Sequence, residues 1–127
     1  MALKITITIN NKNANVIIDT GASRTVFDKE RIKKFVRTRS KKIKDKLSTG
    51  LGTNTMESHH VEISSLAIGK LKIKKYATIL LDLSHVNTSY RQLGLAEVEG
   101  VLGSDILHQY RATINYGKCT LVLLYDK

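Results

Sequence analysis

The chain contains no proline or tryptophan, a single cysteine and no long apolar run. One cysteine cannot form an internal disulfide, so the cysteine content implies no oxidising compartment. No segment approaches the roughly 20 consecutive apolar residues that a transmembrane helix needs. The first ten residues alternate like a strand and lack the basic region and apolar block of a secretory signal. These absences favour a cytoplasmic protein that does not engage a membrane.

The composition is that of one small domain. With 127 residues, of which 42% are hydrophobic, the chain is long enough for one hydrophobic core and too short for two. We therefore expect a single domain over residues 1–127. The only thiol, Cys119, lies in an alternating segment with Thr120 and Leu121, which favours a buried or half-buried thiol over a nucleophile.

Alternating polar and apolar residues predict a mostly β structure. Ile5, Ile7 and Ile9 alternate with polar residues, and the asparagines within 10–13 predict a hairpin turn into a second strand over 15–18. Further strands are expected over 62–66, 71–73, 76–83, 112–116 and 119–125, with a turn at Gly69, and a short helix from an Asp28 cap through Val36.

A lone carboxylate lies where an apolar strand meets a turn of small residues, in segment 16–23 (VIIDTGAS). An aspartate directly after three apolar residues is expected to be partly desolvated, so Asp19 needs hydrogen-bond donors. The hydroxyls of Thr20 and Ser23 and the N–H of Gly21 are the candidates. The segment resembles the active-site turn of aspartic proteases. Because it occurs once, the chain resembles the half-sized retroviral type, the retropepsins, in which two identical chains each supply one aspartate.

Two further segments carry the same resemblance. Segment 101–107 (VLGSDIL) is similar to a family segment in which a strand runs into a short helix behind the catalytic turn. The resemblance assigns structural support of the site to Leu102, Gly103, Ser104 and Asp105. The third segment lies where the family places the glycine-rich tip of its flap, and its residues are Gly50, Leu51, Gly52 and Thr53.

The resemblance implies an all-β fold, a closed retropepsin-like barrel that forms a single lobe with one or two short helices. It implies a homodimeric aspartic endopeptidase that cleaves extended polypeptides without a cofactor or metal ion. Asp19 of one protomer would act as base toward water while its protonated symmetry mate polarises the scissile carbonyl. Thr20 would link the two turns across the axis, and Gly21 would allow close backbone approach. Substrate contacts are implied for Ala22, Ser23, Arg24 and the flap residues.

Arg24 allows two interpretations. An arginine this near the catalytic turn can select an acidic substrate side chain, or it can be exposed or ion-paired with Asp105 or Glu97. Neither interpretation is preferred by the sequence.

Two regions depart from the smallest retroviral enzymes or leave alternatives open. Residues 84–94 predict an amphipathic helical insertion with a serine cap and a glycine stop, and a packed flank is favoured over a role in the substrate groove or dimer contact. The terminal strand 120–125 either forms a dimer interface, as chain termini do in the retroviral enzymes, or is an ordinary core strand.

The net charge of +10 is concentrated in residues 29–46, which hold ten of the 21 basic residues. Such a segment can attract nucleic acid, an anionic membrane or an acidic protein. It lacks interleaved aromatic residues beyond Phe35 and any nucleic-acid-binding motif, so a solvated surface is favoured. The adjacent His59 and His60 lack the spacing of metal ligands.

Two functions therefore remain. The first is a cytoplasmic, homodimeric aspartic endopeptidase. The alternative is a non-catalytic dimerisation module of the same fold that holds a peptide or nucleic acid. Retention of the whole Asp19 turn favours the enzyme, because a binding module has no need for a carboxylate that faces its own copy.

Overall fold

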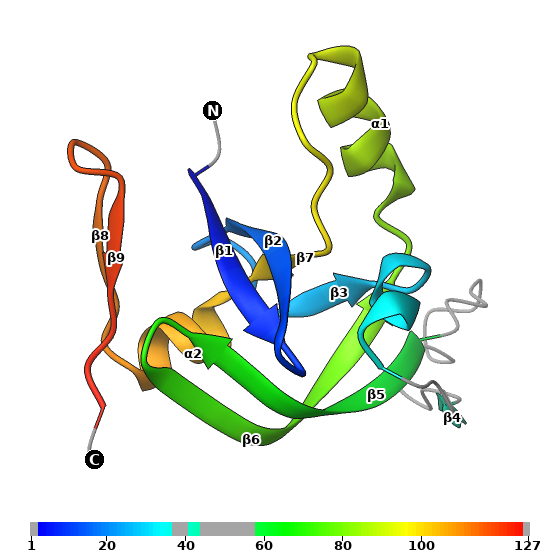
Figure 1. Cartoon of the computed structure of the whole chain (residues 1–127), viewed down its shortest axis with the longest axis horizontal. Coiled ribbons are helices and arrows are strands. Elements are labelled where there is room, and N and C mark those ends of the chain that lie inside the picture. Colours follow the sequence, from blue (N-terminus) through cyan, green and yellow to red (C-terminus); the bar gives the residue numbers. More distant parts are fainter. Residues whose placement is uncertain (1–2, 37–40, 44–57, 126–127) are drawn as a thin grey trace, which may run out of the picture.

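The chain forms a closed β-barrel of six strands (Figure 1). In the computed structural model, which describes residues 3–36, 41–43 and 58–125, the strand order is β1–β2–β7–β3–β6–β5, and pairing between β5 and β1 closes the ring. A further strand, β4, pairs with β5 outside the ring. The elements are β1 (Leu3–Ile9), β2 (Lys12–Ile18), β3 (Val26–Asp28), the 3-10 helix η1 (Arg31–Lys34), β4 (Lys41–Ile43), β5 (Ser58–Ile68), β6 (Leu71–Leu81), α1 (Ser84–Gln92), β7 (Gly100–Leu102), α2 (Ser104–Gln109), β8 (Thr113–Asn115) and β9 (Thr120–Val122).

This architecture confirms the expected all-β barrel with short helices. The interior is filled by the alternate apolar residues of the strands together with side chains from η1 and α2. Residues with no exposed surface in this core are Ile9, Val16, Phe27, Ile32, Ile63, Leu66 and Leu102. Burial of each such side chain contributes about 1.5–3 kcal/mol relative to exposure, so this layer is the main source of fold stability.

Two hairpins form most of the barrel wall. β1 turns into β2 through Asn10 and Asn11, whose φ angles of 49° and 69° are left-handed, as a two-residue hairpin turn requires. Because the turn takes only these two residues, β2 begins at Lys12, before the expected start at Asn15. β5 turns into β6 at Gly69 (φ 59°), where the sequence predicts a tight turn.

β7 passes between β2 and β3, two strands that follow one another in the chain. β7 is parallel to β2, with Gly100 opposite Val16, and antiparallel to β3, with Gly100 opposite Phe27. A Cβ atom on Gly100 would lie 2.5 Å from Phe27 Cδ1 and 2.6 Å from the carbonyl oxygen of Val26. Only glycine therefore allows β7 to approach β3 this closely.

Asp28 fixes the segment that follows β3. Its buried carboxylate accepts hydrogen bonds at Oδ2 from the N–H groups of Glu30 (3.1 Å) and Arg31 (2.9 Å), and at Oδ1 from Leu83 (2.8 Å). Asp28 thus accepts the first N–H groups of the expected helix, but the N-cap residue is Glu30, and the helix is the single 3-10 turn of η1, which ends at Lys34 and not at Val36. No helix in the described ranges is long and apolar enough to cross a membrane.

The predicted insertion over 84–94 is helix α1, which projects from the barrel in Figure 1. Its N-terminus is held by Asp82, which accepts the N–H of Ser84 (2.9 Å), rather than by a serine side chain. Asn87 is buried and forms two hydrogen bonds with the backbone of Val98. The side-chain Nδ2 of Asn87 donates to the Val98 carbonyl (3.0 Å), and its Oδ1 accepts the Val98 N–H (2.8 Å). These bonds fix α1 against the loop that leads into β7.

β8 and β9 form the expected C-terminal hairpin, but as a separate two-stranded sheet beside the barrel (Figure 1). The terminal strand is therefore not an ordinary barrel strand. Its connecting turn spans residues 116–119 and ends at Cys119 with φ 53°. The thiol is exposed, and the prediction of a buried or half-buried Cys119 is wrong because the residue belongs to the turn and not to the alternating strand.

Gly100→Ala is expected to destabilise the protein by about 1–3 kcal/mol, because the added methyl group overpacks the β3–β7 contact. Gly117→Ala is the matched control, since its Cβ would meet nothing closer than Asn115 Oδ1 at 3.3 Å. Urea unfolding followed by circular dichroism measures the difference. Equal unfolding midpoints for the two variants would contradict the tight passage of β7.

Candidate active site

The turn over residues 19–23 connects β2 to β3 at one end of the barrel. The N–H of Asp19 donates to the carbonyl of Leu102 (3.0 Å), so the chain stays paired with β7 as it leaves β2. The N–H of Gly21 donates to Asp19 Oδ1 (2.9 Å), and that of Ala22 donates to the Asp19 carbonyl (3.2 Å). The backbone of the turn thus orients the carboxylate.

Asp19 is exposed in the single chain, so the expectation of partial desolvation is wrong. β2 ends at Ile18, and the following residue already lies outside the buried part of the strand. Of the expected donors only the Gly21 N–H reaches the carboxylate; within the described residues, Oδ2 accepts no hydrogen bond from the protein. A Cβ on Gly21 would lie 3.3 Å from Oδ1, so glycine leaves room for this oxygen.

β7 and α2 support the turn from behind. The N–H of Ser104 donates to the carbonyl of Ala22 (2.7 Å), and the N–H of Gly103 donates to Thr25 Oγ1 (2.9 Å). A Cβ on Gly103 would lie 2.5 Å from both the carbonyl carbon and oxygen of Arg24. Close backbone contact therefore locks the far end of the turn onto the start of α2.

Thr25 and Asp105 form the centre of a hydrogen-bond network beneath the turn. Asp105 Oδ1 accepts the N–H (2.9 Å) and the hydroxyl (2.8 Å) of Thr25, and Oδ2 accepts the hydroxyl of Tyr76. The carbonyl of Thr25 accepts the hydroxyl of Thr78 (3.0 Å). With the Gly103 contact, every polar group of the buried Thr25 is bonded, which gives the turn one fixed position.

The network also shifts two ionisation equilibria. Burial acts to raise the pKa of Asp105, but hydrogen bonds from Tyr76, Thr25 and the N–H of Ile106 outweigh it and hold the pKa of this carboxyl below its ordinary value. Burial and the bond to Asp105 raise the pKa of the Tyr76 hydroxyl. Asp105 is therefore an ionised acceptor and Tyr76 a neutral donor at neutral pH.

Sequence reasoning missed Thr25, Tyr76 and Thr78. Only Asp105 could have indicated this network from the sequence. A carboxylate near the start of a short helix and close to buried strands needs hydrogen-bond donors. The identity of those donors depends on pairing between β3 and β6, which brings Thr78 opposite Thr25 across a separation of 53 residues.

Arg24 is exposed, and it forms no ion pair with Asp105 or Glu97. Asp105 is engaged by Thr25 and Tyr76 as described. Glu97 instead pairs with Arg31 and with Arg91 (Nε to Oε1, 2.8 Å). The interpretation of Arg24 as a partner of either carboxylate is therefore wrong.

Several predicted positions lie apart from this turn or outside the described residues. Gly50, Leu51, Gly52 and Thr53 lie outside them, as do residues 37–40 and 44–46 of the basic segment 29–46. Within its described part, Arg31 is structural because it pairs with Glu97 and Glu99. Thr20 and Ser23 are exposed, and Ala22 is half-buried, on the turn itself.

Comparison with solved structures agrees with the fold. A retroviral protease-like domain of Ddi1 from Leishmania major superposes with a TM-score of 0.65 at 14% identity, over 97% of this chain and 88% of that one. A retropepsin-like aspartic protease from Rickettsia conorii gives 0.62 at 22% identity, over 94% and 80%. The EIAV protease, solved with the inhibitor HBY-793, gives 0.58 at 18% identity, over 91% and 93%.

The sequence comparisons differ in outcome. No curated protein sequence matches the chain. The family described as aspartyl protease matches residues 5–106, which include the turn, Leu102 to Asp105 behind it, and all of the barrel except the first two residues of β1. The chain therefore belongs to the aspartyl protease family and has the retropepsin-like single-lobe fold.

Proposed function

We propose that the chain is an aspartic endopeptidase whose active site forms between two copies, each of which contributes Asp19. The supporting observation is the state of this carboxylate, which is exposed on a braced turn with Oδ1 oriented by Gly21 and Oδ2 open. Such a carboxylate can accept a proton from water, but peptide hydrolysis also needs an acid. The chain carries this turn once, so the second carboxylate comes from a second copy.

Two carboxylates a few Å apart cannot comfortably both ionise, so they share one proton, as is known for aspartic-protease dyads. The ionised Asp19 takes a proton from water as the water oxygen bonds to the scissile carbon. The protonated Asp19 of the other copy donates to the carbonyl oxygen and forms a tetrahedral diol. Collapse of the diol breaks the C–N bond, delivers one proton to the amine and returns the other to the dyad.

The substrate in this proposal is an extended polypeptide that crosses the ends of β2, β7 and β3. An extended segment is held by main-chain hydrogen bonds, and alternate side chains enter pockets. Thr20 links the two turns, Gly21 allows close approach of the substrate backbone, and Ala22 and Ser23 contact its side chains.

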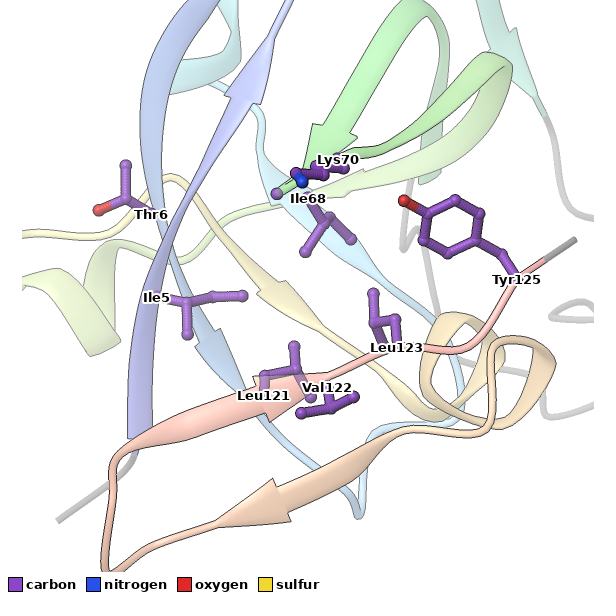
Figure 2. Close-up of a pocket in the computed structure, with 9 residues that line it drawn as sticks. Ile5, Thr6, Ile68, Lys70, Leu121, Val122, Leu123 and Tyr125 are labelled. Carbon is purple, nitrogen blue, oxygen red and sulfur yellow. The ribbon is translucent and has the colours of Figure 1, made fainter. Parts of the chain in front are cut away.

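The inner face of the C-terminal hairpin is turned toward the barrel of its own chain. Figure 2 shows Leu121 and Leu123 facing Ile5 and Ile68 across an apolar groove of about 390 Å³ between β9 and the barrel. These side chains contact the hydrophobic core. The hairpin is therefore held against the barrel by this face.

The outer face of the hairpin is where a second copy docks in this proposal. Leu124, which follows β9, is 57% exposed, and Tyr116 in the connecting turn is 68% exposed. Val122 lies at the edge of the groove and is still 49% exposed. Exposed apolar side chains gathered along the C-terminal hairpin and the segment that follows it are typical of a contact surface. A twofold axis beside the hairpin would bury the same face of both copies.

Asp19→Asn is expected to lower the rate of peptide cleavage at least about 1,000-fold, because asparagine cannot accept the proton from water. The fold and the dimer should persist, since the exposed amide oxygen can still accept the Gly21 N–H. The measurement is digestion of an unfolded protein mixture from acidic to neutral pH, with products identified by mass spectrometry.

The matched control for that experiment is Asp82→Asn, which removes an exposed carboxylate outside the turn. Cleavage by Asp19→Asn at the wild-type rate would overturn the assignment of Asp19. Absence of cleavage by a dimeric wild type would favour the non-catalytic binding module.

Leu124→Glu is expected to weaken the dimer at least about tenfold and to reduce activity in parallel, because the charge is buried twice in a twofold interface. Leu93→Glu is the matched control, since Leu93 is 73% exposed on the loop after α1. Sedimentation velocity over a range of concentrations gives the dimer dissociation constant. If Leu93→Glu dissociates the dimer and Leu124→Glu does not, the insertion and not the hairpin carries the contact.

The Asp105 network should stabilise the fold in a pH-dependent manner. Because its folded pKa is depressed, Asp105 contributes stability that is present above its ordinary unfolded pKa of about 4 and is lost as pH falls through the lower folded value. The turn thus remains braced at the mildly acidic pH at which a carboxylate dyad holds its shared proton.

Asp105→Asn is expected to cost about 1–3 kcal/mol of unfolding free energy at pH 7, because the charged acceptor of three hydrogen bonds is lost. The difference from wild type should shrink below about pH 4 as Asp105 becomes protonated. Urea unfolding at several pH values measures this. The control is the exposed Glu62→Gln, and a penalty that is constant down to pH 2 would contradict the ionised-acceptor role.

A further inference from the structure

We propose that Arg24 makes the enzyme select substrates with acidic side chains on both sides of the scissile bond. This inference rests on the proposed peptidase function and concerns the substrate class of the same site. It follows from the position of Arg24, from the engagement of the neighbouring carboxylates and from the symmetry of a two-chain site.

Arg24 and Asp19 lie on opposite sides of the end of β7. Asp19 donates its N–H to Leu102 on one side of β7, while the backbone of Arg24 contacts Gly103 on the other side. Leu102 and Gly103 are consecutive, so the two functional residues flank the same strand end. Neighbouring strands are about 4.8 Å apart, which puts the Asp19 and Arg24 backbones roughly 10 Å apart across β7.

The position of Arg24 is also well fixed. The next residue, Thr25, is held through all of its polar groups, and the carbonyl of Arg24 lies against Gly103. The side chain itself is exposed, so the charge is presented from a rigid backbone toward solvent.

Asp105 and Glu97, the two carboxylates considered as ion-pair partners of Arg24, are already engaged elsewhere. Both oxygens of Asp105 accept hydrogen bonds from Thr25 and Tyr76. Glu97 and Glu99 both pair with Arg31, and Glu99 also accepts the N–H of Asn15 (2.6 Å). No described carboxylate is bonded to Arg24, so its guanidinium group can form a two-point ion pair with an incoming acidic side chain.

The distance between Asp19 and Arg24 predicts which substrate residue Arg24 contacts. An extended peptide rises about 3.3 Å per residue, so a distance of roughly 10 Å corresponds to about three residues from the bond that Asp19 attacks. A twofold dimer places one Arg24 on each side of that bond. The acidic preference should therefore occur at mirrored positions, two to three residues before and after the cleavage point. The net charge of +10 adds to this by attracting acidic segments over longer range.

The test is a mass-spectrometric profile of cleavage sites in a random-sequence peptide library, with the 127-residue chain as wild type and four variants. Wild type should cleave peptides with Asp or Glu at the mirrored positions roughly tenfold faster than the corresponding Asn or Gln peptides. Arg24→Gln should lose this ratio, Arg24→Glu should favour Lys or Arg at the same positions, and Arg24→Lys should retain part of the acidic preference. Lys29→Gln, which removes an exposed charge after β3, is the control and should keep the full preference.

The possible outcomes separate this inference from the proposed function. Cleavage by wild type without acidic preference, or a preference that survives in Arg24→Gln and Arg24→Glu, would overturn the role of Arg24 and leave the peptidase intact. A complete lack of cleavage by wild type would overturn the peptidase and the selectivity together. Circular dichroism of each variant checks folding, and the reversal in Arg24→Glu is a gain of cleavage at new sites that an unfolded protein cannot produce.

Discussion

The passage of β7 between β2 and β3 is the constraint on which the rest of the structure depends. It joins two strands that are adjacent in the chain but not in the sheet, and it holds both ends of the turn between them. Gly100 and Gly103 permit it, since a side chain at either position would collide with Phe27 or Arg24. A barrel with β2 paired directly to β3 would leave the turn as an unsupported loop.

The site follows from that crossing. Because the turn is bonded at Leu102, Ser104 and Asp105, Asp19 is presented to solvent without help from surrounding side chains. The network uses an ionised Asp105 behind the turn to fix the exposed Asp19 in front of it. Two chemically identical carboxyl groups thus have different roles because their surroundings differ. Each chain supplies only half of the proposed site. Catalysis in this proposal therefore depends on the association of two chains.

Sequence reasoning predicted the features that local chemistry determines. Alternation in β1, the asparagine turn, Gly69, the hydrogen bonds from the start of η1 to Asp28 and the helical insertion all have short-range signals, and all are present. Sequence reasoning failed for the features that depend on pairing between residues distant in the sequence. The partners of Asp105 come from β3 and β6, the exposure of Asp19 depends on where the barrel ends, and Cys119 was misplaced because its turn takes four residues. The hairpin's detachment from the barrel also has no local signal.

The most direct test of the two-chain site is to titrate inactive Asp19→Asn chains into wild type at constant total concentration, with exchange of subunits before assay. If each active site needs Asp19 from both copies, mixed dimers are inactive and activity falls as the square of the wild-type fraction. If one chain is sufficient, activity falls in direct proportion to that fraction, and the shared-dyad mechanism is contradicted.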